Sequence, residues 1–390
     1  MILTKLYKEF FNSEKAGGLI LVSMTVLSLV LANSPCQNTY TNFWNLEFGG
    51  HSIMHWINDG LMTIFFLLIG LELEREIYKG ELSNLKNASL PIFGAVGGMI
   101  FPAAIFLLFN FGTNTQSGVG IPMATDIAFA IGILSLLGKR VPSSLKVFLT
   151  ALAIIDDLGA IIIIAVFYST TLSLIHLIIA LGIFCFLLLL NKLKVNNIIP
   201  YLIGGAVMWY FMSISGIHPT LSGIMLAFTI PFRDGSEKSP SYVLQHLLHK
   251  PVAFIILPLF VLANTGIRIE SNLIDGLGQE YGLGIITGLV IGKPLGIWLF
   301  SLIGVSIGLC SLPSDLNWRS IIGVGFLGGI GFTMSIFIDL LAYDIPIIVN
   351  TAKIAIFIGS LIAGTIGVIW LRLTLTNTIT DEGKMILEEK

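Results

Sequence analysis

The sequence is poor in charged residues. Asp, Glu, Lys and Arg make up 11% of its 390 residues, apolar residues make up 55%, and the mean hydropathy is +0.91. Soluble domains carry roughly 25% charged residues, so this deficit excludes most soluble classes. No long polar linker separates the apolar runs. We therefore expect one integral membrane transporter domain over residues 1–390, with a short N-terminal segment at 1–14 and a C-terminal tail at 373–390.

Two further shortages narrow the function. The three cysteines, Cys36, Cys185 and Cys310, are far apart and odd in number, so neither a disulfide framework nor a zinc site is indicated. The net charge is -2, with 21 basic and 23 acidic residues, so no basic surface is available for nucleic acid. We expect no cofactor and no nucleic-acid partner, and membrane lipid as the surroundings.

Long apolar runs are what the sequence has in abundance. A helix needs about 20 apolar residues to cross roughly 30 Å of hydrocarbon. We predict twelve transmembrane helices in an all-α membrane protein. They lie at 17–33, 58–73, 90–110, 120–138, 145–168, 172–191, 198–214, 218–232, 251–266, 283–308, 320–342 and 349–371.

The basic residues predict an orientation. With the N-terminus in the cytoplasm, 18 of the 21 Lys and Arg residues fall in cytoplasmic segments, and Arg268 alone falls in an outer loop. Lys293 and Lys353 fall within predicted spans. Cytoplasmic loops are enriched in Lys and Arg, so both termini are predicted to be cytoplasmic.

The outer loop at 34–57 is the longest. Gly49-Gly50 lies there between partly alternating polar and apolar residues, a pattern typical of a two-residue hairpin turn. A hairpin this small is marginal alone, so residues 45–53 could pair with a second copy. An ordinary flexible loop is the alternative.

Four charges lie near the centres of predicted spans: Asp126, the pair Asp156 and Asp157, and Lys293. Each costs about 2.5 to 3.5 kcal/mol on insertion scales, so we expect them to share a polar cavity or to contact one another. Adjacent helical residues point about 100° apart, which lets Asp156 and Asp157 have different partners. Lys293 is the one positive charge near the centre of a predicted span that is available to pair with either of them. A buried ion pair that only fixes helix packing is the alternative.

Two spans carry helix-breaking residues at mid-length. The fourth has Pro122 before Thr125 and Asp126, and the eleventh has Gly328, Gly329 and Gly331 before Thr333. Proline and glycine interrupt helices, and the freed backbone is tolerated in a membrane only beside protein or water. The half-helix ends then carry partial charges suited to ions. Close helix packing through small residues is the alternative for the glycines.

The interrupted spans are each the middle member of a run of three, spans 3–5 and spans 10–12. The two runs enter the membrane with opposite orientation. Inverted repeats with interrupted helices crossing near the bilayer midplane are typical of secondary transporters.

Several long motifs in one order resemble the NhaA-type sodium/proton antiporter family over residues 15–372. They include Trp-Ile-Asn-Asp-Gly-Leu-Met at 56–62 and the stretches at 65–72, 124–128, 151–160, 292–296 and 329–337. The resemblance implies twelve helices, cytoplasmic termini, a bacterial inner membrane and a homodimer formed through the hairpin.

The resemblance also implies roles for residues. Asp156 and Asp157 would bind sodium or protons, Lys293 would partner Asp156, and Thr125 and Asp126 would lie at the crossing. The family's pH-responsive region corresponds to Glu72, Arg75, Glu76, His246 and His249. The sequence departs from the family pattern at Glu74, Gln245 and Asp339, which leaves the pH set point open.

We predict a secondary active, electrogenic and pH-regulated antiporter, not an enzyme, that exports sodium or lithium in exchange for protons by alternating access. A sodium-coupled organic-solute symporter of similar fold is one alternative. An intramembrane aspartyl protease is another, although the Gly-x-Gly-Asp signature of that class is absent.

Overall fold

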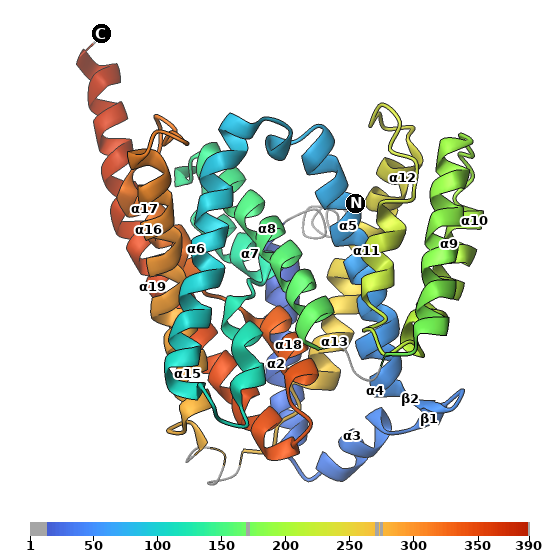
Figure 1. The fold of residues 1–390 in the computed structure, drawn as a ribbon. Helices are drawn as coiled ribbons and strands as arrows, with labels where there is room; N and C mark the ends of the chain where they lie inside the picture. The colour runs from blue at the N-terminus through green and yellow to red at the C-terminus, as the bar shows by residue number, and fades with distance from the viewer. Residues whose placement is uncertain (1–13, 169–171, 270–272, 274–275, 389–390) are drawn as a thin grey trace, which may run out of the picture. The chain divides into compact units, whose positions relative to one another are not determined.

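The computed structural model describes residues 14–168, 172–269, 273 and 276–388, and most of them are helical (Figure 1). The helices group into two compact units. The first contains Met1–Leu19, Asn84–Ala160 and Ile269–Lys390, and the second contains Ile20–Ser83 and Ile161–Arg268. The predicted spans 3–5 and 10–12 fall in the first unit, apart from the last turns of the fifth.

The first unit is built from long helices and interrupted ones. Its elements are α6 (Leu85–Asn110), η3 (Gln116–Met123), α7 (Ile127–Leu136), η4 (Gly138–Arg140), α8 (Ser143–Phe167), α15 (Glu280–Thr287), η6 (Gly288–Gly292), α16 (Lys293–Ser306), α17 (Trp318–Gly328), α18 (Phe332–Ala342) and α19 (Pro346–Glu388). The last turns of α8 continue into the second unit. Helices α6 and α16 touch backbone to backbone, since a Cβ atom on Gly97 would lie 2.1 Å from the Gly296 carbonyl oxygen.

The second unit holds the remaining elements. They are most of α2 (Glu14–Ala32), α3 (Gln37–Trp44), β1 (Glu47–Phe48), β2 (His51–Ser52), α4 (Ile53–His55), η1 (Trp56–Leu61), α5 (Met62–Tyr78), η2 (Glu81–Ser83), α9 (Leu174–Lys192), α10 (Ile199–Ser213), α11 (Leu221–Ala227), α12 (Pro240–Pro251), η5 (Val252–Ile256) and α13 (Leu257–Asn264). Glycine again permits close packing, because a Cβ atom on Gly223 of α11 would lie 2.3 Å from the Thr63 carbonyl oxygen of α5.

The number of spans differs from the prediction. Eight helices among the described residues are long and apolar enough to cross a membrane, and ten if each of two bent helix pairs forms one span. The predicted spans 198–214 and 218–232 contain helices of only 15 and 7 residues, α10 and α11. At 1.5 Å per residue even α10 covers only about 22 Å. Pro231 lies four residues after the end of α11 and limits its length, because its ring would clash with the Ala227 carbonyl group if the α-helix continued.

The hairpin predicted at residues 45–53 is confirmed. Strands β1 and β2 pair antiparallel, with Glu47 opposite Ser52 and Phe48 opposite His51. Gly49 and Gly50 form the turn with φ values of 62° and 84°. Two consecutive positive φ angles define the tight turn that favours glycine at both positions.

Within the described residues, three of the membrane spans contain a π-helical turn, which the sequence did not predict. These turns are η1, η5 and η6, and each one is continuous with an α-helix on at least one side. A π-helical turn widens the helix and often lies at a functional site. Lys293 follows η6 directly, so this turn positions the one cation that the sequence places at mid-span.

Candidate functional site

The fourth predicted span is interrupted where its sequence indicates. The 3₁₀ helix η3, which contains Pro122, ends at Met123, and α7 begins at Ile127. Between them the chain is extended, with ψ angles of 149° at Ala124 and 96° at Asp126. The Asp126 carboxylate then caps α7 by accepting a 2.9 Å hydrogen bond from the Phe129 N–H. A helix N-terminus stabilises a carboxylate in this position.

The eleventh predicted span is interrupted as well. Helix α17 ends at Gly328, α18 begins at Phe332, and the two are bent by 48°. A Cβ atom on Gly329 would lie 2.4 Å from the Leu289 carbonyl oxygen, and one on Gly331 would lie 2.0 Å from Ser335 Oγ. The break therefore requires glycine because backbone and side chains approach it closely.

The two breaks are hydrogen-bonded to each other. The Asp126 N–H donates to the Ile330 carbonyl oxygen at 2.7 Å. Thr125 Oγ1 lies 2.8 Å from the Gly328 carbonyl oxygen. These contacts satisfy backbone groups that the interrupted helices leave without a helical partner, as a buried backbone requires. The predicted crossing of two interrupted segments is thus present in the first unit.

Asp156 of α8 reaches this crossing. Its Oδ2 atom lies 2.8 Å from Lys293 Nζ and 2.7 Å from Thr125 Oγ1. Lys293 Nζ also donates to the Met123 carbonyl oxygen at the end of η3. Asp156 Oδ1, by contrast, is buried and accepts no hydrogen bond from any residue that the structure describes. One carboxylate oxygen is therefore occupied by hydrogen bonds and the other is available to a ligand.

The polar side chains at the crossing are almost inaccessible to solvent. Thr125 and Lys293 are 0% exposed, Asp156 and Asp157 are 1% exposed, and Asp126 is 2% exposed. Asp157 lies beside Asp156 on α8 and interacts electrostatically with Lys293. Three carboxylates and one ammonium group leave an excess of negative charge when all are ionised. Such a cluster can be balanced by cations, including protons.

Known proteins resemble the chain over nearly its whole length. The family profile described as "Na+/H+ antiporter 1" matches residues 8–371. The "Na(+)/H(+) antiporter NhaA" of Flavobacterium psychrophilum is 65% identical over 381 residues, which cover 98% of this chain and 99% of that protein. The "Na(+)/H(+) antiporter NhaA 1" of Flavobacterium johnsoniae is 67% identical over 376 residues, which cover 96% and 99%.

The chain belongs to the NhaA family of sodium/proton antiporters. It is therefore a multi-pass membrane transporter and not an enzyme. A solved structure of the sodium/proton antiporter MjNhaP1 from Methanocaldococcus jannaschii has a TM-score of 0.55 and covers 95% of this chain and all of that one. At 18% identity this likeness shows that the two proteins share a fold.

The residues that the NhaA resemblance links to pH response lie in the second unit, on α5 and α12. Arg75 stacks over the Tyr242 ring at 5.4 Å, and that ring stacks on His246 at 6.0 Å. Glu76 Oε2 accepts a 3.0 Å hydrogen bond from the Glu81 N–H. Glu72 lies on α5 and His249 on α12. The structure thus links Arg75 to His246 through one aromatic ring.

Glu74, one of the departures from the NhaA pattern, is buried in the same contact. Its side chain is 4% exposed, and its Oε2 atom accepts a 2.8 Å hydrogen bond from Ser241 Oγ on α12. A carboxylate here adds one side-chain hydrogen bond between α5 and α12.

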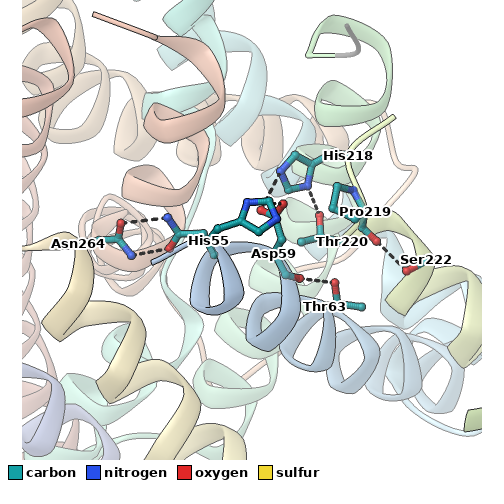
Figure 2. A network of polar contacts seen from close by, with 9 residues as sticks. His55, Asp59, Thr63, His218, Pro219, Thr220, Ser222 and Asn264 are labelled. Atoms are coloured by element: carbon teal, nitrogen blue, oxygen red, sulfur yellow. Dashed lines mark hydrogen bonds and ion pairs between the residues drawn. The ribbon is translucent and has the colours of Figure 1, made fainter. Parts of the chain in front are cut away.

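A further polar network in the second unit was not predicted from the sequence (Figure 2). Asp59 in η1 lies 3.5 Å from His55 Nδ1 and 3.8 Å from His218 Nε2. Asn58 and Asn264 exchange amide hydrogen bonds of 2.7 and 3.3 Å, and Figure 2 shows both interactions. Asn58 and Asp59 belong to the motif at 56–62 that resembles the NhaA family, but polar residues are common near the start of a span, so the sequence indicated no partners for them.

Proposed function

We propose that the chain exports sodium, and also lithium, in exchange for protons at a site formed by Asp156 and Asp157. The observation that carries this proposal is the buried Asp156 carboxylate, which is held at a crossing of two interrupted helices with one oxygen bonded and one open. The names of the two Flavobacterium relatives support sodium and protons as the exchanged ions.

The ligands at the crossing suit a small hard cation. Hard cations take oxygen ligands from carboxylates and backbone carbonyl groups. Asp156 Oδ1 supplies a buried carboxylate oxygen, and Asp157 adds a second carboxyl group on the next residue of α8. Thr125 Oγ1, beside Asp156, adds a hydroxyl oxygen. Asp126 accepts hydrogen bonds from the N-terminal ends of α7 and α18 and adds a negative charge near these ligands.

Sodium transport and proton transport are coupled because the two ions cannot occupy the same carboxylates at the same time. A proton on either carboxylate removes the charge that attracts sodium, and a bound sodium ion disfavours protonation of the same groups. Sodium and protons therefore compete for Asp156 and Asp157. Opening the site to one side of the membrane at a time then converts competition into exchange.

Lys293 can make the exchange electrogenic. Its ammonium group forms an ion pair with Asp156 Oδ2, and this ion pair stabilises the protonated form of Lys293. A sodium ion that binds Asp156 weakens the ion pair. If Lys293 then loses a proton, one more proton is released for each sodium ion bound. Each net charge moved then adds about 2.3 kcal/mol of driving force per 100 mV of membrane potential.

The finer architecture follows from the same interpretation. The two short helices α10 and α11, counted with the longer ones, give twelve membrane segments within one transporter domain over residues 1–390. Both termini would lie in the cytoplasm of a bacterium whose inner membrane contains the protein. Spans 3–5 and 10–12, which share the first unit, would be the inverted repeats that alternate access at the crossing.

Regulation and assembly complete the proposal. The contacts between α5 and α12 at Arg75, Tyr242 and His246 would form part of the region that responds to cytoplasmic pH. Glu72, Glu76 and His249 would belong to the same region. The hairpin formed by β1 and β2 would pair with a second copy, because its short strands leave backbone groups available at both edges.

Proteoliposomes test the proposed exchange. With an imposed pH gradient and the voltage clamped by valinomycin, added sodium or lithium should collapse the gradient, and potassium should not. The Asp157→Asn protein should lose this exchange. The Asp344→Asn protein, altered at an exposed carboxyl beyond α18, should retain it. Undiminished exchange by Asp157→Asn would refute the site assignment.

A further inference from the structure

A second pair of opposite charges is buried in the first unit. Asp339 on α18 is 0% exposed and Lys353 on α19 is 7% exposed. Helix α18 packs against α19, and the two side chains attract each other electrostatically. Charged side chains are almost never fully buried unless they are paired. Asp339 and Lys353 are therefore placed as partners.

Asp339 and Lys353 attract each other without a direct ion-pair contact. They differ in this from Lys293 and Asp156 at the crossing, where Lys293 Nζ lies 2.8 Å from Asp156 Oδ2. Within the described ranges neither oxygen of Asp339 accepts a hydrogen bond, and no ion pair within 4.0 Å joins it to Lys353. An ionised carboxylate buried without hydrogen bonds is strongly unfavourable, and the neutral acid is much less so. This open arrangement favours a proton on Asp339.

Few other titratable groups surround Asp339. Lys353 faces it from α19, and the sequence of η3, which also packs against α18, contains no titratable side chain. Asp339 is the only titratable residue of α18 itself. Tyr343 follows that helix and donates its hydroxyl to the Thr115 carbonyl oxygen at 2.8 Å, while its ring contacts Tyr281. A change of charge at Asp339 therefore acts chiefly on Lys353.

We propose that Asp339, opposite Lys353, is a proton-binding site separate from the carboxylates at the helix crossing. A proton taken from water forms an O–H bond with one carboxylate oxygen and removes one negative charge from α18. When the proton leaves to water, the carboxylate is restored and attracts the Lys353 ammonium group on α19. The ligand is the proton alone, and no oxidation or reduction takes place.

Helix α18 connects this site to the crossing. Thr333, six residues before Asp339, donates both its N–H and its hydroxyl to Asp126. Six residues of helix span about 9 Å. A negative charge at that distance disfavours ionisation of other carboxylates, so protonation of Asp339 lets the carboxylates at the crossing ionise at lower pH and exchange their protons for a cation there. This coupling, unlike the proton site itself, rests on the proposed exchange function.

Infrared difference spectroscopy tests the proton site without any transport assay. The full-length protein in lipid is titrated, and the carbonyl stretch of a protonated carboxylic acid is followed. The Asp339→Asn protein should lose one such band that the Asp344→Asn protein retains. In the Lys353→Gln protein the midpoint of that band should move to higher pH, because a cation favours the ionised acid. Spectra of Asp339→Asn that superimpose on those of the parent would overturn the proposal.

The pH profile of exchange tests the coupling. Removing the carboxylate in Asp339→Asn should move half-maximal exchange to lower pH by about 0.5 unit or more, and Lys353→Gln should move it to higher pH. An identical profile in both variants would refute the coupling. A parent protein that shows the Asp339 band but exchanges no cation would contradict the proposed function and still support the proton site.

Discussion

Thr333 donates two hydrogen bonds to Asp126 Oδ2, from its backbone N–H at 3.1 Å and from its hydroxyl at 2.5 Å. Asp126 also caps α7 through Oδ1. One carboxylate therefore binds the N-terminal ends of two helices, α7 and α18, which belong to the two interrupted spans. Both ends carry partial positive charge, so their attraction for Asp126 holds the breaks together.

Replacing Thr333 by Val should weaken this junction. The variant keeps the shape and the backbone N–H but loses the hydroxyl, which leaves a buried carboxylate with one bond fewer. Such a loss costs about 1–3 kcal/mol. A lower thermal unfolding midpoint and slower exchange are expected, and Thr333→Ser should restore both. Thr287→Val is the matched control, because Thr287 Oγ1 bonds only carbonyl oxygens of its own helix, α15. Equal behaviour of the Val and Ser variants would contradict the prediction.

Removing Lys293 should destabilise the protein through Asp156. The Lys293→Met variant leaves the Asp156 carboxylate buried without its cation, and breaking a buried pair in this way costs about 3–5 kcal/mol. The double variant Lys293→Met/Asp156→Asn should recover most of that loss, because the uncompensated charge is gone. The thermal unfolding midpoints of the two single variants and the double variant measure the coupling. Purely additive effects would mean that the pair contributes nothing.

The native cysteines can test the proposed orientation. Cys36 is exposed in the loop predicted to lie outside, and Cys310 lies in the loop before α17, which is predicted to be cytoplasmic. A membrane-impermeant maleimide applied to spheroplasts should label Cys36, and Cys310 should react only after permeabilisation. Burial raises the pKa of the Cys310 thiol. Since the thiolate is the reactive form, its labelling should be slow near neutral pH and speed up as pH rises. Labelling of Cys310 in intact spheroplasts would reverse the proposed topology.

The hairpin can be tested as a dimer contact. Phe48 on β1 is 76% exposed, so its side chain is accessible to a second copy of the hairpin. Replacing residues 47–52 by a Gly-Ser segment of equal length should convert a dimer to a monomer in light scattering. Phe48→Ser should weaken the dimer less, because edge-to-edge pairing depends mainly on backbone hydrogen bonds. A dimer that persists after the full replacement would place the interface elsewhere.

The buried charged residues of the crossing could be located from the sequence because charge is costly in a membrane. Asp126, Asp156 and Lys293 were found from their positions in apolar runs, and Pro122 and Gly329 were found from their effect on helices. Each of these signals is local in sequence. The structure confirms that Asp156 contacts Lys293 and that the two interrupted segments cross.

The partners of these residues could not be predicted in the same way. The sequence places Asp126 and Thr333 at the two helix breaks, but nothing in it indicates that these residues bond to each other. Nothing indicates the Met123 carbonyl group as a hydrogen-bond acceptor for Lys293 either. The length of α11 was also missed, because the expected span was drawn from hydropathy, which does not register the effect of Pro231 on the helix. The pairing of Glu74 with Ser241 depends on how α5 meets α12, which only the tertiary structure reveals.

The π-helical turn η6 makes the position of Lys293 depend on a residue count. Adjacent helical residues are about 100° apart, so deleting one residue within 288–292 would rotate the preceding and following parts of the span by that angle relative to each other. The Lys293 ammonium group would then be directed away from Asp156, although the composition and hydropathy of the span would hardly change. A one-residue deletion here would therefore disable the site, whereas conservative substitutions at Leu289, Val290 and Ile291 would leave the direction of Lys293 unchanged.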